Sequence, residues 1–181
     1  MKNSMTNKPL VVITGASHGI GRALAIKFAE ESYPCLLISR HIEPVSELQN
    51  KFIIYEKVDV TDFNAIKSAI VKAEALYGKT ECIINNAGLI NIGELRDMAI
   101  EKCSYEFDVL VKGVLNGIKT VISDMSARKS GTIINISSMG DRIPSPSRWF
   151  HVVQVIIPFR FLTISEVPGT PYSIIDKSQC I

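Results

Sequence analysis

The chain has no long apolar run, no paired cysteines and almost no charge imbalance, and each absence excludes a class of protein. Its densest apolar stretch, residues 152–157, ends at Pro158, whereas a membrane-spanning helix needs about 20 apolar residues. A formal net charge of +2 gives no reason to expect a nucleic acid or a membrane surface as a partner. The four cysteines form no CxxC pair and have no histidine at metal-ligand spacing, so we expect reduced core thiols and no metal site.

Length and composition predict one folded domain. The 181 residues are 46% hydrophobic, which is enough to bury a core. We assign residues 1–147 to a nucleotide-binding domain and residues 148–181 to a diverged tail that is not a separate domain. The amino terminus is polar and too short for a secretory signal, which together with the reduced cysteines predicts a cytoplasmic protein.

Apolar runs alternate with segments of helical periodicity up to residue 137. Continuous apolar strands between amphipathic helices are typical of a parallel sheet covered on both faces. Right-handed crossovers then give a doubly wound α/β sheet of the Rossmann type, incomplete at its C-terminal end, with ligand at the carboxyl ends of the strands. The expected strands are residues 10–14, 35–39, 52–58, 81–85 and 131–137, and the expected helices are 20–32, 44–51, 62–77 (capped by Thr61 and ended by Gly78) and 100–125.

Three glycines follow the first expected strand in the spacing GxxxGxG. A glycine turn between a strand and a helix lets the backbone approach a pyrophosphate closely, and the helix N-terminus presents N–H groups to it. We therefore predict a nucleotide site in this turn. Its expected residues are Gly15, Ser17, His18, Gly19, Ile20 and Gly21.

Four segments, taken together, resemble the short-chain dehydrogenase/reductase family. They are residues 14–21, 59–60, 85–88 and 135–138, in that order, and the resemblance covers residues 8–146. It implies that the first segment holds the cofactor pyrophosphate and that Asp59 and Val60 contact the adenine. It also implies that Asn86, Ala87 and Gly88 shape the sheet beside the cofactor.

The residues after the second expected strand favour NADP(H) over NAD(H). A carboxylate at this point would accept a hydrogen bond from the ribose 2′-hydroxyl and would repel a 2′-phosphate. The chain instead has Ser39 followed by Arg40, and His18 and Arg22 add positive charge nearby. We therefore include Arg40 among the expected cofactor-binding residues. The alternative is that Arg40 is a solvated surface arginine.

The family resemblance also implies a catalytic serine, a tyrosine and a lysine in the spacing YxxxK, and an asparagine on the long helix. Ser138 matches the serine, but no YxxxK occurs anywhere in the chain. His151 and Val155 stand where the tyrosine and the lysine are expected, and Leu110 stands at the asparagine position. We assign His151 no catalytic role, because Val155 cannot supply the charge of the lysine.

The sequence after residue 147 departs from the family pattern. A change of reading frame or splicing near residue 147, or a deletion that joins the fifth strand to later sequence, would each explain the departure. The loss would leave the fifth strand at a sheet edge and remove the helix of the usual dimer contact, so the oligomeric state stays open.

These observations predict an NAD(P)(H)-dependent oxidoreductase that acts on a small-molecule carbonyl/alcohol pair, with turnover impaired by the missing YxxxK. The alternative is a catalytically silent NADP(H)-binding or interaction protein.

Overall fold

A single six-stranded sheet forms the centre of the molecule. The computed structural model describes residues 7–49, 52–136 and 163–166. The strands lie in the order β3-β2-β1-β4-β5-β6, and the first five run parallel. Their bounds are β1 Leu10–Thr14, β2 Cys35–Ile38, β3 Ile53–Glu56, β4 Thr80–Asn85, β5 Thr132–Asn135 and β6 Thr163–Glu166.

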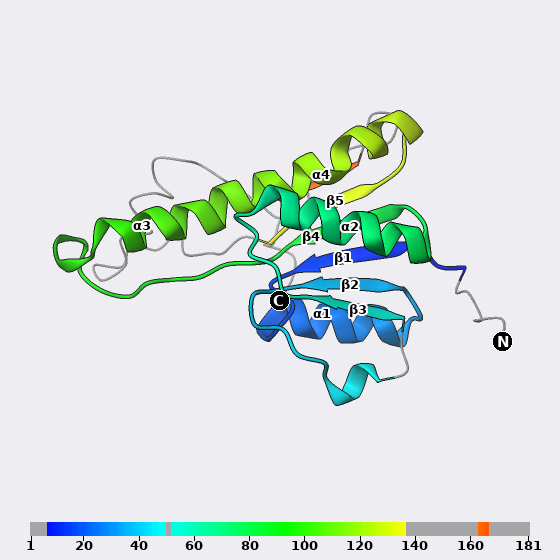
Figure 1. The fold of residues 1–181 in the computed structure, drawn as a ribbon, viewed down its shortest axis with the longest axis horizontal. Coiled ribbons are helices and arrows are strands. Elements are labelled where there is room, and N and C mark those ends of the chain that lie inside the picture. Colours follow the sequence, from blue (N-terminus) through cyan, green and yellow to red (C-terminus); the bar gives the residue numbers. More distant parts are fainter. Residues whose placement is uncertain (1–6, 50–51, 137–162, 167–181) are drawn as a thin grey trace, which may run out of the picture.

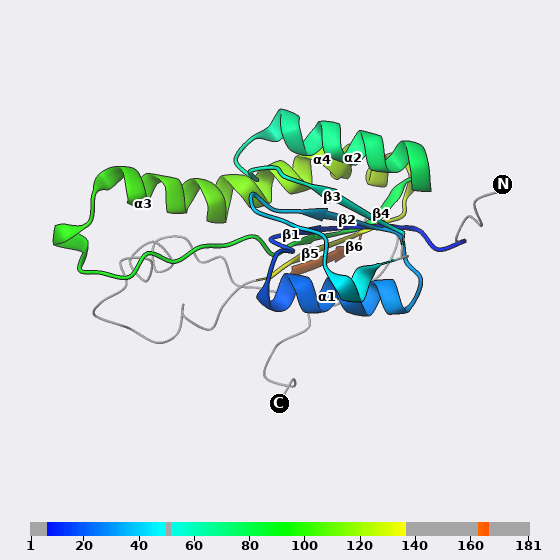
Figure 2. The same ribbon diagram turned by 60° about the horizontal axis from the view of Figure 1, so that its bottom comes forward.

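Helices cover both faces of this sheet. Helix α1 lies on one face, and helices α2 and α4 lie on the other (Figures 1 and 2). The bounds are α1 Gly19–Glu30, α2 Phe63–Tyr77, α3 Ile100–Phe107 and α4 Gly113–Arg128, with short 3₁₀ turns at Ser46–Leu48 and Leu95–Asp97. A π-helical turn, η3 at Asp108–Lys112, joins α3 to α4. The predicted long helix is therefore confirmed, with a wider turn in its middle.

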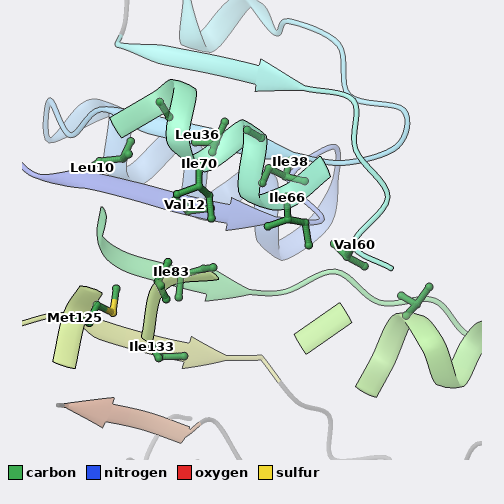
Figure 3. Packing of buried hydrophobic residues seen from close by; sticks show 14 residues of the cluster. Leu10, Val12, Leu36, Ile38, Val60, Ile66, Ile70, Ile83, Met125 and Ile133 are labelled. Carbon is green, nitrogen blue, oxygen red and sulfur yellow. The ribbon is translucent and has the colours of Figure 1, made fainter. Parts of the chain in front are cut away.

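The apolar strands are buried because successive side chains face opposite helix layers. All five residues of β1 are buried. Leu10 and Val12 pack with α2 and α4, where Ile66 and Ile70 of α2 lie over the sheet (Figure 3). Val11 and Ile13 belong to a second cluster, which includes alanines of α1. The prediction of a parallel α/β sheet with two covered faces is thus confirmed.

The strand order places a candidate ligand site. From β1 the chain moves outward to β2 and β3, then returns to the other side of β1 to form β4 and β5. Ligands of such sheets bind at the carboxyl ends of the strands where the order reverses, here between β1 and β4. The segments after β1 and β4 are the predicted glycine turn and residues 86–88.

The start of α2 differs from the prediction by one residue. Asp62, not Thr61, is the N-cap, and its Oδ1 accepts a hydrogen bond from the backbone N–H of Ala65 at 3.0 Å. The Thr61 hydroxyl donates instead to Oδ1 of Asp59 at 2.9 Å. The helix ends at Gly78 as predicted.

Helix α4 approaches the sheet closely at Gly117. A Cβ placed on Gly117 would lie 2.1 Å from Oδ1 of Asn85, so only glycine allows this approach. Asn85 also donates through Nδ2 to Oδ1 of Asn135 at 2.9 Å, which joins β4 to β5 beneath the helix. These contacts fix α4 against the carboxyl end of β4, which Asn85 links to β5.

The expectation that the fifth strand forms an edge is wrong. Strand β6 pairs antiparallel with β5, with Asn135 opposite Thr163 and Thr132 opposite Glu166. In this register β6 begins beside the last residue of β5 and therefore runs in the opposite direction. A parallel sixth strand would need to start at the opposite end.

The thiols behave as core residues. Cys35 and Cys103 are buried, Cys82 is half-buried, and all three are unpaired; Cys180 lies outside the described residues. Burial raises the pKa of Cys35 and of Cys82 to about 12, so neither forms a thiolate at neutral pH. Among the residues that the structure describes, no helix has the length and apolarity to cross a bilayer.

Candidate functional site

The three motif glycines serve different purposes in the turn after β1. Gly15 has φ +66°, and a Cβ there would lie 2.6 Å from Cα of Ala87. Gly19 has φ +56° but faces open space, with nothing within 4 Å of an added Cβ. A Cβ on Gly21 would lie 2.4 Å from the carbonyl oxygen of Gly15. The turn is therefore packed tightly at Gly15 and Gly21 and open at Gly19.

Thr14 and Asn86 clamp this turn to the end of β4. The Thr14 hydroxyl oxygen accepts from the backbone N–H groups of Asn86 at 3.0 Å and Ala87 at 3.1 Å. In the other direction, Nδ2 of Asn86 donates to the carbonyl oxygens of Thr14 and Gly15, both at 3.1 Å. Asn86 thus holds the shape of the glycine turn.

The N-terminus of α1 has no side-chain cap. His18 occupies the N-cap position without forming a capping hydrogen bond, and no acidic residue lies in the first turn. By contrast, Asp62 caps α2. The first N–H groups of a helix lack partners within it and carry a partial positive charge. The open turn at Gly19 therefore presents uncapped donors that suit an anion.

A short series of hydroxyl contacts links the turn to the end of β2. The Ser39 hydroxyl donates to the Ser17 hydroxyl at 3.1 Å, and Ser17 Oγ lies 2.8 Å from Nδ1 of His18. His18 is exposed, and so is Ile20, at 59%. Ser17 and His18 are therefore brought to the β2 edge of the site, as a cofactor that spans both loops would require.

Arg40, Tyr105 and Asp59 form a second chain of contacts at the same edge. Nη1 of Arg40 donates to the Tyr105 hydroxyl at 2.6 Å, and that hydroxyl donates to Oδ2 of Asp59 at 2.6 Å. The Arg40 guanidinium also lies over the Tyr105 ring, 5.4 Å from its centre. The second oxygen of Asp59 accepts from the backbone N–H and the hydroxyl of Thr61.

These contacts shift the pKa values of both Asp59 and Tyr105. Partial burial raises the pKa of Asp59, but hydrogen bonds from Tyr105 and Thr61 and the charge of Arg40 outweigh burial and leave the pKa below its usual value. Burial and the hydrogen bond to Asp59 raise the pKa of Tyr105, while Arg40 opposes the rise. At neutral pH Asp59 is therefore a carboxylate and Tyr105 a neutral phenol.

Val60 lies behind this edge. It is 6% exposed, and its carbonyl oxygen accepts from Nδ2 of the buried Asn116 at 2.9 Å. A Cβ on Gly113 would lie 2.7 Å from Val60 Cγ2, so α4 packs directly on this side chain. Asn116 therefore supports the loop after β3, and it does not take the place of the missing asparagine at position 110.

Arg22 does not add free charge to the site. Its Nη2 lies 2.6 Å from Oε1 of Glu47, which belongs to the 3₁₀ turn after β2. The positive charge expected from Arg22 is therefore neutralised by Glu47, a partner that the motif spacing does not reveal.

Arg40 presents N–H donors just after the end of β2. Its side chain is exposed, and its bonds to described residues leave most of its N–H donors uncommitted.

The structure covers part of the expected catalytic set. Leu110 lies in the π-helical turn, and its Cδ2 is 3.5 Å from the position of a Cβ on Gly88. The residue at the asparagine position thus faces the segment after β4, where an apolar side chain cannot hold water. Ser138, His151 and Val155 lie outside the described residues.

Three residues of this region were not among the predicted site residues. The Thr14 side chain is the central acceptor of the clamp, and its place directly before Gly15 was the signal available. Glu106, wholly buried on α3, accepts through Oε2 from the backbone and side chain of Asn91 and ties the loop after β4 to the helix. Tyr105 precedes the part of the helix with a recognisable pattern, so no motif indicated it.

Comparisons with known proteins agree with this geometry. Residues 9–149 match the model of the family described as short chain dehydrogenase. Oxidoreductase UcpA of Salmonella typhimurium is 35% identical over 141 residues, which are 75% of this chain and 54% of that protein. The chain thus spans about half the length of the curated relatives that it matches.

Solved structures share the fold. The serine dehydrogenase of Escherichia coli superimposes with a TM-score of 0.69 and 25% identity over 76% of this chain and 66% of that one. A 4-hydroxyisoleucine dehydrogenase complexed with NADH gives a TM-score of 0.70 and 21% identity over 81% of this chain and 63% of that one. On its sequence motifs, its fold and the extent of the family match, this chain belongs to the short-chain dehydrogenase family.

Proposed function

We propose that this chain binds NADP(H) at the carboxyl edge of its sheet and is an oxidoreductase that acts on a carbonyl/alcohol pair. The observation that carries the proposal is the uncapped N-terminus of α1, set beside a glycine turn that Thr14 and Asn86 hold in shape. Uncapped N–H donors beside an open, clamped turn suit a pyrophosphate.

The residues of the site fit the parts of a dinucleotide. Gly19 leaves the approach to the helix N-terminus open, while Gly15 and Gly21 allow the close packing that shapes the turn. Asp59, which remains a carboxylate at neutral pH, is suited to accept from the adenine amino group. Val60 lies behind it, held by Asn116. The segment of Asn86, Ala87 and Gly88 follows β4 and is suited to lie beside the part of the cofactor that carries the nicotinamide.

Charge at the end of β2 supports NADP(H) over NAD(H). An NAD-preferring site places a carboxylate here to accept from the ribose 2′-hydroxyl, but Ser39 and Arg40 occupy this point. The exposed guanidinium of Arg40 suits a 2′-phosphate, and Ser17, Ser39 and His18 add hydrogen-bonding groups beside it. The 4-hydroxyisoleucine dehydrogenase was solved with NADH, but that likeness is one of fold and does not decide the preference of this chain.

The reacting end differs from the family pattern. When bound, the nicotinamide supplies or accepts the hydride. We propose that Ser138 binds the substrate oxygen, as the resemblance implies. Without YxxxK the chain lacks the motif in which a lysine lowers the pKa of the tyrosine, so proton transfer at neutral pH loses its usual donor. We therefore propose that turnover by this chain is impaired.

A second candidate is a protein that binds the nucleotide without turnover, because it has the cofactor-binding residues but lacks most of the catalytic ones. The position of Leu110 favours it. A leucine that faces Gly88 removes the polar group that the family places on this helix and leaves an apolar contact instead. Such a protein would bind NADPH as tightly as the first candidate and transfer no hydride.

Two measurements on the whole chain separate these candidates. Fluorescence enhancement of NADPH tests binding, and loss of reduced-nicotinamide absorbance with a panel of aldehydes and ketones tests hydride transfer. Slow oxidation of NADPH that disappears in Ser138→Ala supports the oxidoreductase. Binding without oxidation by any carbonyl supports the silent protein. Absence of NADPH binding would overturn both candidates.

A further inference from the structure

We propose that Tyr105 is a specificity-determining residue, which holds Arg40 in place for the 2′-phosphate of NADP(H). This proposal rests on the proposed function, because it assigns a residue to the preference for NADP(H). Its evidence is the chain of contacts from Arg40 through the Tyr105 hydroxyl to Asp59, which joins the ends of β2 and β3 to α3.

The direction of both hydrogen bonds of the Tyr105 hydroxyl follows from the chemistry of its partners. A carboxylate only accepts, and a guanidinium only donates. The Tyr105 hydroxyl must therefore give its proton to Asp59 and accept from Arg40 through its oxygen. Both distances are 2.6 Å, and for the bond from the hydroxyl to Asp59 this is the usual length with a charged acceptor. Phenylalanine at position 105 would keep the ring but lose both bonds.

Tyr105 reduces the freedom of an otherwise exposed arginine. Arginine side chains have many rotamers, and ordering one on binding weakens affinity. Here the guanidinium lies over the ring, 5.4 Å from its centre, and the hydroxyl holds Nη1. An arginine has five N–H donors, so those not bound to Tyr105 stay available for phosphate oxygens. Arg40 is thus ordered before the ligand arrives and keeps the donors that a phosphate needs.

Tyr105 also lies between Asp59 and Arg40 and keeps them from pairing directly. A free carboxylate close to Arg40 would form a direct ion pair and compete with a phosphate for its donors. With Tyr105 between them, Arg40 bonds to a neutral oxygen, while Asp59 keeps its charge and its bonds to Thr61. The arrangement lets one edge present a cation for a 2′-phosphate and a carboxylate for an adenine amino group.

The test compares two nucleotides that differ only in the 2′-phosphate, adenosine 5′-monophosphate and adenosine 2′,5′-bisphosphate. Neither carries the nicotinamide, so the readout is independent of activity. Calorimetric titrations compare the whole wild-type chain with its Tyr105→Phe, Arg40→Ala and double variants. Tyr33→Phe is the matched control, because it deletes a hydroxyl before β2, at the opposite end of that strand. Thermal melting verifies that each variant is folded.

Loss of pre-ordering predicts that Tyr105→Phe weakens binding of the bisphosphate about two- to tenfold and leaves the monophosphate unchanged. The double variant should bind the bisphosphate no more weakly than Arg40→Ala, since Tyr105 acts through Arg40. An equal change for both nucleotides, no change, or tighter binding by Tyr105→Phe would each overturn the proposal. If Arg40→Ala lowers the preference but Tyr105→Phe does not, only the role of Tyr105 fails. If Arg40→Ala leaves the preference unchanged, the preference for NADP(H) fails as well.

Discussion

Removal of the Asn86 amide should loosen the glycine turn by an amount that the structure allows us to estimate. The Asn86→Ala change deletes two hydrogen bonds, from Nδ2 to the carbonyl oxygens of Thr14 and Gly15. At about 1 kcal/mol for each bond, the free energy of unfolding should fall by about 2 kcal/mol. For a chain of this size that loss lowers Tm by about 4–8 °C.

Denaturant titration and thermal melting measure this loss. Asn86→Asp is a useful second variant, because it keeps the size of the side chain but places acceptors against two carbonyl oxygens and should destabilise at least as much. Asn64→Ala is the control, since Asn64 is exposed on α2 and should change stability by less than about 0.5 kcal/mol. If Asn86→Ala is as stable as this control, the clamp does not hold the turn and the reasoning is wrong.

Three further predictions concern the helix contact, the nucleotide turn and pH. Gly117→Ala should destabilise the chain by about 1–3 kcal/mol in denaturant titration, because its Cβ would overlap Oδ1 of Asn85; a smaller loss would mean that α4 shifts freely. Gly19→Asp should weaken NADPH binding more than about tenfold, because it adds a carboxylate at the helix N-terminus in open space. The left-handed φ of +56° costs an aspartate about 1 kcal/mol, so Tm should fall by only about 2–4 °C; retained affinity would place the pyrophosphate elsewhere. Because the folded-state pKa of Asp59 is lowered, its stabilisation is present above the usual aspartate pKa of about 3.9 and is lost as pH falls through the folded value. The stability difference between the wild-type chain and Asp59→Asn should therefore shrink as pH falls below about 4, and a difference that stays constant with pH would contradict the assignment.

The sequence predicted the sheet because its strands are apolar on both faces. Strands β1 and β2 are buried along their whole length, and such burial requires helices on both sides of the sheet. The glycine turn was predictable because its backbone angles and close packing require glycine. Asn86 was included through the family resemblance, and its hydrogen bonds to the turn were not predicted. The cap of α2 was misplaced by one residue because Thr61 and Asp62 are both good caps, and only the structure shows Thr61 bound to Asp59.

Contacts between distant segments could not be predicted in this way. The chain of Arg40, Tyr105 and Asp59 joins three segments through single side chains that leave no periodic pattern. Arg22 was placed correctly on the first turn of α1, but its partner Glu47 comes from a short turn 25 residues later. Strand β6 likewise depends on where the chain re-enters the sheet, which local composition does not determine.

The most direct test of the central claim is calorimetric titration of the wild-type chain with NADPH and with NADH under the same conditions. The account predicts one binding site, with NADPH bound at least about tenfold more tightly because of its charge-assisted contact with Arg40. Equal or tighter binding of NADH would contradict the assignment of Arg40, and no binding of either nucleotide would contradict the assignment of the glycine turn.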